Sequence, residues 1–225
     1  MFVYNESMNT KTLKWIALIL MTIDHIGVHL VKSPSMYLTL KIIGRGAYPL
    51  YAFMLVNGFI HTKNMKKYFF RLFIFAALIE LSYLILYLYN GTNYLLRNNI
   101  MLTLFASLLS LYLISHQKWY IKILTILVLV ISYLLKIDGS IYAILMVLFF
   151  YLSPSVWFNL LALAVLNFVF IWFEAMPVYQ WASLYVIPLL FFYNGQYGKI
   201  NRYFHYFYYP LHILVILLIK VLFKL

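Results

Sequence analysis

Cysteine is absent from this chain of 225 residues, which excludes disulfides, cysteine metal sites and a covalent thioester on the protein. Acidic residues are also scarce, because five Asp and Glu stand against 17 Lys and Arg. The sequence contains no Gly-x-Ser-x-Gly elbow, P-loop or dinucleotide fingerprint. Phosphoryl transfer and hydride chemistry therefore find no support.

Hydrophobic residues make up 66% of the chain and charged residues only 10%. Apolar runs recur from end to end, so the sequence predicts an all-α polytopic helical membrane protein with a single transmembrane domain over 1–225. Short loops separate about nine predicted spans, with eight or ten as the neighbouring counts. These spans cover 12–31, 37–60, 68–89, 99–115, 119–136, 140–152, 155–173, 178–193 and 203–223.

The formal net charge of +12 would suggest nucleic acid binding in a soluble protein. Here the basic residues lie mostly in short loops and at helix ends, which indicates membrane topology and contact with anionic lipids. We therefore expect membrane lipids, and no nucleic acid, as partners. A cytoplasmic N-terminus places ten of the 17 basic residues on the cytoplasmic side. The other seven, Lys41 among them, lie toward the opposite face or within spans.

The first span carries Asp24 and His25 at its middle. An ionisable group at bilayer depth is costly, by roughly 2.5–3.5 kcal/mol for Asp on insertion scales, and usually marks a site. His25 and His29 are one helical turn apart, the spacing of a two-histidine metal pair, but no third ligand follows and we expect no metal. Asp24 is about 100° around the helix from His25, so it faces another neighbour. His25 is either a working base or a buried histidine that ties helices together.

The second span is interrupted by Gly44, Gly46 and Pro49, which predict a weakened or broken helix with Arg45 in the gap. Arg45 has two interpretations. It pairs with Asp24 or Glu80 as a structural bridge, or it holds the phosphate or carbonyl of a ligand.

Further polar residues follow these two spans. A basic segment contains His61, Lys63, Lys66, Lys67 and Arg71, and either obeys the charge rule for a cytoplasmic loop or docks a phosphorylated cofactor. Asn99 opens the fourth span. In the last span, His212 follows Tyr209 and Pro210 and either enters the central site or caps a kinked turn.

These stretches together resemble the TraX family of bacterial membrane proteins, named for the pilin N-acetylase of conjugative plasmids. The match is collinear and covers nearly the whole chain. It runs through Leu13 to Gly27, Ile42 to Phe53, Gly58 to Asn64, Tyr68, Arg71-Leu72, Glu80, Asn99, Leu102 to Leu104, Asp138-Gly139, Tyr193 to Gly195 and Phe207 to His212. Two positions depart from the family pattern: Asn57 stands where a Glu is usual, and Leu81-Ser82-Tyr83 replaces Ile-Pro-Phe.

The resemblance implies acyl transfer from acetyl-CoA in the bacterial cytoplasmic membrane. His25 would be the base or acyl carrier, with Asp24 and Arg45 as its catalytic partners. The basic residues Lys63, Lys66, Lys67 and Arg71 would bind the nucleotide end of the donor. We expect the substrate to be bound by Glu80, His61, Asn99, His212 and Tyr209, and we expect Asp24, His25, Arg45 and Glu80 to share one central site.

Two other classes of protein share parts of this pattern. A small transporter or flippase also carries polar residues at mid-depth and broken helices, but the sequence has no repeat symmetry. If the chain were a structural membrane protein, the intramembrane polar residues would have no function. Within the acyltransferase class, a peptide N-terminus, an envelope glycan, a lipid-linked sugar and a small molecule all stay open as the acceptor, and the oligomeric state is open as well.

Overall fold

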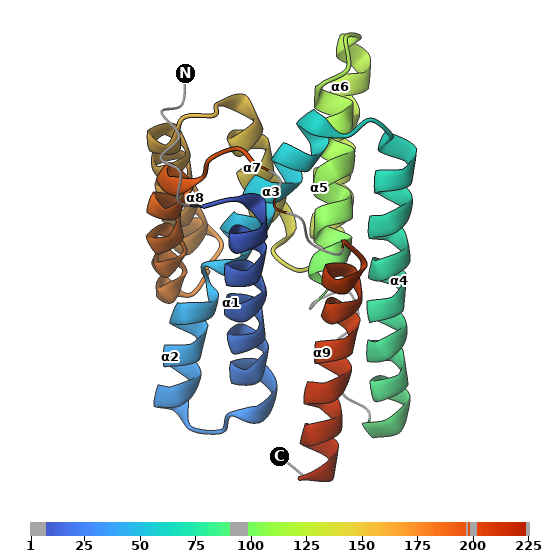
Figure 1. Ribbon diagram of the computed structural model, residues 1–225, viewed down its shortest axis with the longest axis vertical. Helices are drawn as coiled ribbons and strands as arrows, with labels where there is room; N and C mark the ends of the chain where they lie inside the picture. The colour runs from blue at the N-terminus through green and yellow to red at the C-terminus, as the bar shows by residue number, and fades with distance from the viewer. Residues whose placement is uncertain (1–7, 91–98, 197, 199–201, 224–225) are drawn as a thin grey trace. The chain divides into compact units, whose positions relative to one another are not determined.

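The computed structural model describes residues 8–90, 99–196, 198 and 202–223, and the regular structure within them is helical (Figure 1). The predicted all-α class is confirmed. The chain packs as two compact units, one formed by Met1–Met54 with Ser153–Leu225 and the other by Leu55–Leu152. Helix α3, Ala47–His61, passes from the first unit to the second.

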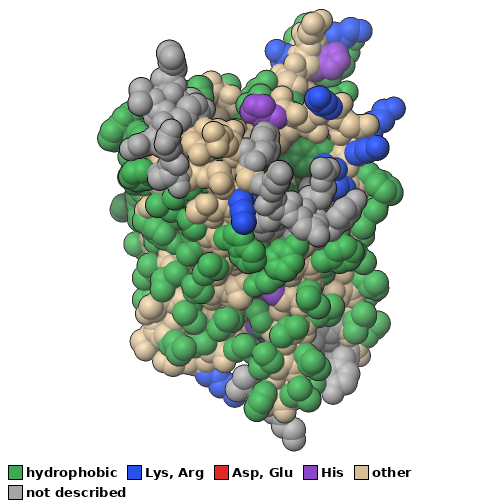
Figure 2. Space-filling model, viewed as in Figure 1, with side chains coloured by type: hydrophobic (Ala, Val, Ile, Leu, Met, Phe, Trp, Pro, Cys, Tyr) green, Lys and Arg blue, Asp and Glu red, His purple; other side chains and the backbone are tan. Residues whose placement is uncertain are grey.

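Three helices are long and apolar enough to cross a membrane, over Thr10–Leu30, Met65–Ile85 and Val156–Phe173. Five further apolar helices among the described residues are shorter. Large apolar side chains face outward from several of these helices, including Ile126 on α6 (Trp119–Leu134) and Leu161 on α8 (Val156–Phe173), which are 60% and 64% exposed. Figure 2 shows such side chains over most of the visible face. An apolar exterior of this kind is expected where lipid is the solvent, and the chain is a membrane protein.

The first unit contains α1 (Thr10–Leu30), α2 (Pro34–Gly44), the start of α3, α8 (Val156–Phe173), the 3₁₀ helix η1 (Val178–Phe192) and α9 (Arg202–Leu222). A short connection joins α1 to α2, and the two helices lie side by side (Figure 1). Helix α9 also packs on α1, and η1 packs on both α8 and α2. Asn9 begins α1 by accepting a hydrogen bond from the backbone N–H of Thr12.

The predicted break in the span 37–60 is confirmed, because α2 ends at Gly44 and α3 begins at Ala47. A Cβ added at Gly46 would meet the side chains of Val186 and Tyr185, so glycine permits this close approach of η1. The hydroxyl of Tyr185 donates a hydrogen bond to the carbonyl of Ile43 in the last turn of α2. The interruption therefore gives η1 access to the backbone at the end of α2.

The predicted span 178–193 is a 3₁₀ helix rather than an α-helix, and it ends one residue earlier than expected, at Phe192. Pro188 lies inside it, and in an α-helix its ring would clash with the carbonyl four residues earlier. Side chains three residues apart line up along a 3₁₀ helix. The buried residues Gln180, Ser183 and Val186 follow that spacing, and Ser183 accepts a hydrogen bond from the side chain of Asn167 on α8.

The second unit contains the end of α3 together with α4 (Met65–Asn90), α5 (Ile100–Ile114), α6 (Trp119–Leu134) and α7 (Ser140–Leu152). Helix α5 contacts α4, α6 and α7. Small buried hydroxyl residues lie on it, among them Thr103, Ser107 and Ser110. Such residues let neighbouring helices approach closely in an apolar environment.

Candidate functional site

Asp24 binds two cations at the interface of α1 and α2. The Nζ atom of Lys41 donates to Oδ2 of Asp24 at 2.8 Å, and Nη2 of Arg45 donates to Oδ1 at 3.2 Å. The side chains of Lys41, Asp24 and Arg45 are 7%, 19% and 26% exposed. The Arg45–Asp24 pair is the structural bridge that the sequence offered as one interpretation of Arg45.

Arg45 is held from a second side by η1. Its Nη1 donates to Oε1 of Gln180 at 3.1 Å, and its guanidinium lies 5.5 Å from the ring centroid of Tyr179. Asp24 can accept from both cations because the backbones of α1 and α2 come close here. A Cβ added at Gly44 would lie only 2.9 Å from Cα of Asp24.

We define the ion cluster as Asp24, Lys41 and Arg45, in which one carboxylate faces two basic side chains. The formal charges sum to +1, since −1 from Asp24 is combined with +1 from each basic residue. A net positive charge in a poorly solvated position favours a negative group nearby. The ion cluster can therefore attract an anionic ligand or stabilise negative charge that develops in a reaction.

His25 and Asp24 both lie on α1, but His25 contacts a different element from the one that binds Asp24. Its Nδ1 lies 2.7 Å from Nε2 of His212 on α9, and the two ring planes are 14° from parallel. Nδ1 of His212 in turn lies 2.9 Å from the carbonyl oxygen of Tyr208, one turn earlier on α9. His212 thus contacts His25 and also bonds its own helix near Pro210, while its expected contact with substrate stays a prediction.

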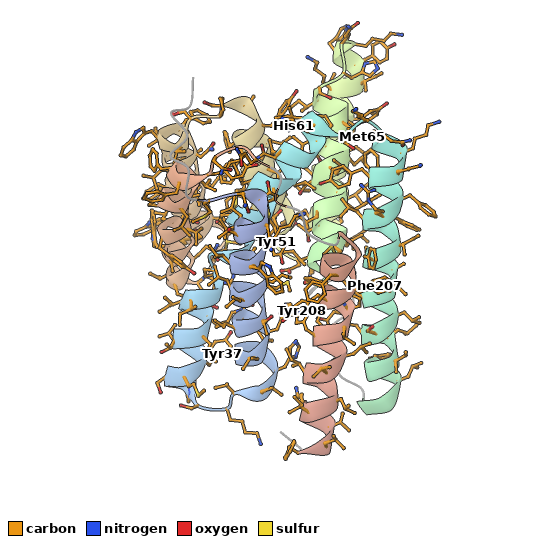
Figure 3. The ribbon with its side chains drawn as sticks, in the orientation of Figure 1. Tyr37, Tyr51, His61, Met65, Phe207 and Tyr208 are labelled. Atoms are coloured by element: carbon orange, nitrogen blue, oxygen red, sulfur yellow. The ribbon has the colours of Figure 1, made fainter. Side chains whose placement is uncertain are left out.

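Aromatic rings of α9 enclose the histidine pair. Tyr209 is buried and packs edge-on against both imidazoles, with centroid distances of 5.9 Å to His25 and 5.2 Å to His212. The ring of Tyr208 is stacked on His212 at 5.2 Å, and its hydroxyl lies 2.9 Å from Oγ1 of Thr22. Figure 3 shows Tyr208 on α9 together with Tyr51, whose hydroxyl donates to the sulfur of Met21 on α1.

His29 is buried one turn after His25, with a centroid distance of 6.2 Å between the rings. Among the residues that the structure describes, no three His, Cys, Asp or Glu side chains are grouped to hold a metal ion. The arrangement around His25 is instead a pair of hydrogen-bonded imidazoles on α1 and α9. It lies in the same unit as the ion cluster, which is next to it along α1.

Comparison with known proteins places the chain in a family, because the sequence model described as "TraX protein" matches residues 9–220. The chain belongs to the TraX family. It is also similar to the "Probable fimbrial assembly protein FimC, serogroup H1" of Dichelobacter nodosus, with 28% identity over 231 residues. That alignment covers 93% of this chain and 94% of the relative. No solved structure matches the chain.

Other residues in the stretches that resemble the TraX family lie in the second unit. Glu80 on α4 accepts a hydrogen bond from Nδ2 of Asn99 at 2.9 Å. Asn99 is fully buried, also donates to the carbonyl of Ala76, and caps α5 by accepting from the N–H of Leu102. Asn99 therefore joins α4 to α5, while its expected contact with substrate stays a prediction.

The basic segment surrounds the start of α4. Lys63, Lys66 and Lys67 are exposed, whereas Arg71 is partly buried with its guanidinium 5.7 Å from the ring centroid of Tyr68. His61 ends α3, and its Nδ1 lies 2.8 Å from the carbonyl oxygen of Asn57 in the same helix. In Figure 2, Lys and Arg side chains gather over this end of the second unit, where Figure 3 labels His61 and Met65.

Sequence reasoning missed Lys41 and Gln180. Lys41 lies one helical turn before Arg45, so the pair had the spacing of two residues on one helix face. That spacing inside an apolar span was the available signal for Lys41. Gln180 had no comparable signal, because its contact with Arg45 joins residues 135 apart and depends on how η1 packs.

Proposed function

We propose that this chain is a membrane-embedded acyltransferase that moves an acetyl group from acetyl-CoA to an amine or hydroxyl acceptor. The observation that carries the proposal is the part-buried hydrogen bond between His25 and His212 within an apolar helix pair. Imidazoles at such a position are suited to proton transfer or to carrying an acyl group. The neighbouring ion cluster supplies the positive charge that such a reaction uses.

In the base mechanism, a ring nitrogen of His25 removes the proton from the acceptor as its nitrogen or oxygen attacks the thioester carbonyl. The C–S bond then breaks, CoA leaves as a thiolate, and the proton on His25 is passed to that thiolate or to solvent. Negative charge develops on the carbonyl oxygen during the attack, and Arg45 is the residue we assign to stabilise it. Asp24 keeps Arg45 in place.

The donor would bind at the basic segment formed by Lys63, Lys66, Lys67 and Arg71. CoA carries several phosphate charges, and the exposed lysines lie at the start of α4, where the helix dipole is positive. This supports docking of the nucleotide end of acetyl-CoA at this place. Glu80, His61, Asn99 and Tyr209 keep their predicted roles in binding the substrate.

We place the protein in the bacterial cytoplasmic membrane with nine spans and a cytoplasmic N-terminus. His25 follows Thr10 by 15 residues on α1, about 22 Å along the helix axis. It therefore lies toward the end of α1 that points away from the cytoplasm, and we infer an acceptor that approaches from that side. A fimbrial subunit fits this requirement, in line with the name of the relative from Dichelobacter nodosus. Because the chain has no cysteine, labelling of a Lys63→Cys variant only from the cytoplasmic side would support this orientation, and labelling only from outside would contradict it.

The decisive experiment measures acetyl-CoA turnover by the purified protein with and without candidate acceptors. His25→Ala should lower turnover by about 10²–10⁴-fold, the usual contribution of a general base. The matched control is His116→Ala, because His116 lies in the loop between α5 and α6 and outside all candidate residues. Turnover of folded His25→Ala near the wild-type rate would show that His25 has no such role.

A transporter or flippase is the second candidate, and the broken α2–α3 helix favours it. Transport leaves the thioester intact. Purified protein that binds acetyl-CoA or a lipid-linked substrate but never cleaves the thioester would decide for this alternative.

A further inference from the structure

The hydrogen bonds of the histidine pair determine which ring nitrogens of His25 and His212 carry a proton. A backbone carbonyl only accepts hydrogen bonds. Nδ1 of His212 lies 2.9 Å from the carbonyl oxygen of Tyr208, so this nitrogen carries a proton and donates it. In a neutral His212, Nε2 is then the nitrogen with the lone pair.

The same reasoning extends to His25. Its Nδ1 lies 2.7 Å from Nε2 of His212, and one of these two nitrogens must donate. Because Nε2 of a neutral His212 is an acceptor, the proton lies on Nδ1 of His25. The lone pair of His25 is therefore on Nε2, the nitrogen that points away from His212.

The opposite assignment requires His212 to be an imidazolium that donates from both nitrogens. His212 is 7% exposed, and the ion cluster beside His25 on α1 already carries one uncompensated positive charge. A further buried positive charge without a carboxylate is costly. The neutral pair is the arrangement that the charges favour.

The surrounding rings hold this geometry in place. Thr22 donates its hydroxyl proton to the carbonyl of Leu18 at 2.8 Å, so the hydroxyl of Tyr208 must donate to Thr22. This bond fixes the ring of Tyr208, which is stacked on His212. Tyr209 packs edge-on against both imidazoles. Neither imidazole can rotate without displacing these rings.

We propose that His212 is a positioning residue that fixes the tautomer of His25, so that Nε2 of His25 is the atom that takes the proton of the acyl acceptor. The assignment rests on the proposed acyltransferase function. When Nε2 is protonated, Nδ1 of His25 still donates to His212, which stabilises the new charge. His212 thus occupies the place that a carboxylate holds in a serine protease triad, with the carbonyl of Tyr208 behind it.

The test uses the full chain labelled with ¹⁵N-histidine, in which ring-nitrogen shifts report whether each nitrogen carries a proton. The His25 signals are assigned by their loss in His25→Ala. At neutral pH the wild-type protein should show His25 protonated on Nδ1 and unprotonated on Nε2. A wild-type spectrum with the proton on Nε2 would overturn the proposal, and this measurement needs no variant at position 212.

Two variants then separate positioning from a structural role. His212→Gln keeps an acceptor oxygen near the position of Nε2, so it should keep the tautomer and most of the activity. His212→Leu removes the acceptor, so His25 should become a mixture of tautomers, and kcat should fall by about 10²–10⁴-fold with the KM for acetyl-CoA nearly unchanged. His29→Gln is the matched control on α1, and this variant should have the same His25 tautomer and the same kcat as the wild type.

The outcomes distinguish this proposal from the proposed function. An unchanged tautomer and kcat in folded His212→Leu would overturn the role of His212. If His212→Leu does not fold, loss of the Nδ1–H tautomer in His212→Gln would also count against it. The expected tautomer in a wild-type protein that never cleaves acetyl-CoA would support the positioning of His25 and overturn the acyltransferase function.

Discussion

Replacing Asp24 by Asn keeps the shape of the side chain but removes the charge that compensates both Lys41 and Arg45. Two cations with side chains 7% and 26% exposed then remain in contact with a neutral amide. Breaking a buried ion pair by removing one partner costs about 3–5 kcal/mol. We expect Asp24→Asn to lower the free energy of unfolding by that amount, measured by titration with sodium dodecyl sulfate in mixed micelles.

The charge count of the ion cluster supplies the controls. Lys41→Met leaves the Asp24–Arg45 pair intact and balanced, so it should cost only the lost hydrogen bond to a charged group, about 1.5–3 kcal/mol. Combining Asp24→Asn with Lys41→Met removes the repulsion between two uncompensated cations. The double variant should therefore be more stable than Asp24→Asn alone, which requires a coupling energy larger than the loss in Lys41→Met, toward the upper end of the usual range of about 0.5–3 kcal/mol.

Two results would refute this reasoning. One is an Asp24→Asn protein within about 1 kcal/mol of the wild type, a loss well below that of a broken buried pair. The other is a double variant less stable than Asp24→Asn, which would mean that the two cations do not depend on a shared carboxylate. Neither measurement requires knowledge of the substrate.

Two more predictions concern packing and the donor. Gly44→Ala should lower the melting temperature in detergent, because the new Cβ would lie 2.9 Å from Cα of Asp24. Gly27→Ala should have a smaller effect, because its nearest contact would be the Cβ of Leu40 at 3.0 Å. Equal melting temperatures would contradict the close approach of α1 and α2. Replacing both Lys66 and Lys67 by Glu should raise the KM for acetyl-CoA. The KM should also depend less on salt concentration than in the wild type, since salt screens exposed charges over about 8–10 Å. Lys122→Glu on α6 serves as the control. An unchanged KM in the double variant would mean that the basic segment only determines membrane topology and does not bind the donor.

The sequence was sufficient for those parts of the structure that depend on local chemistry. The helical class followed from apolar runs, and the break between α2 and α3 followed from Gly44, Gly46 and Pro49. The 100° step between neighbouring helix residues separated Asp24 from His25, and the two side chains do have different partners. These features require no knowledge of how helices pack.

The same reasoning could not identify contacts between residues that are far apart in the sequence. His212 was one of several candidates near His25, because nothing local specifies that α9 packs on α1 with these two rings in register. Asn99 caps α5 and donates hydrogen bonds to α4, and these contacts depend on how the two helices pack. Its expected contact with substrate stays a prediction. The type of helix at 178–192 could not be predicted either, since apolar composition does not distinguish an α-helix from a 3₁₀ helix.

The 3₁₀ winding of η1 changes the relation between residue count and reach. Fifteen residues extend about 22 Å as an α-helix but about 30 Å at the 2.0 Å rise of a 3₁₀ helix. The second length equals the hydrocarbon thickness of a typical bilayer. A segment too short to cross as an α-helix therefore has the length to do so in this form, and rewinding it as an α-helix would require roughly five more residues for the same distance.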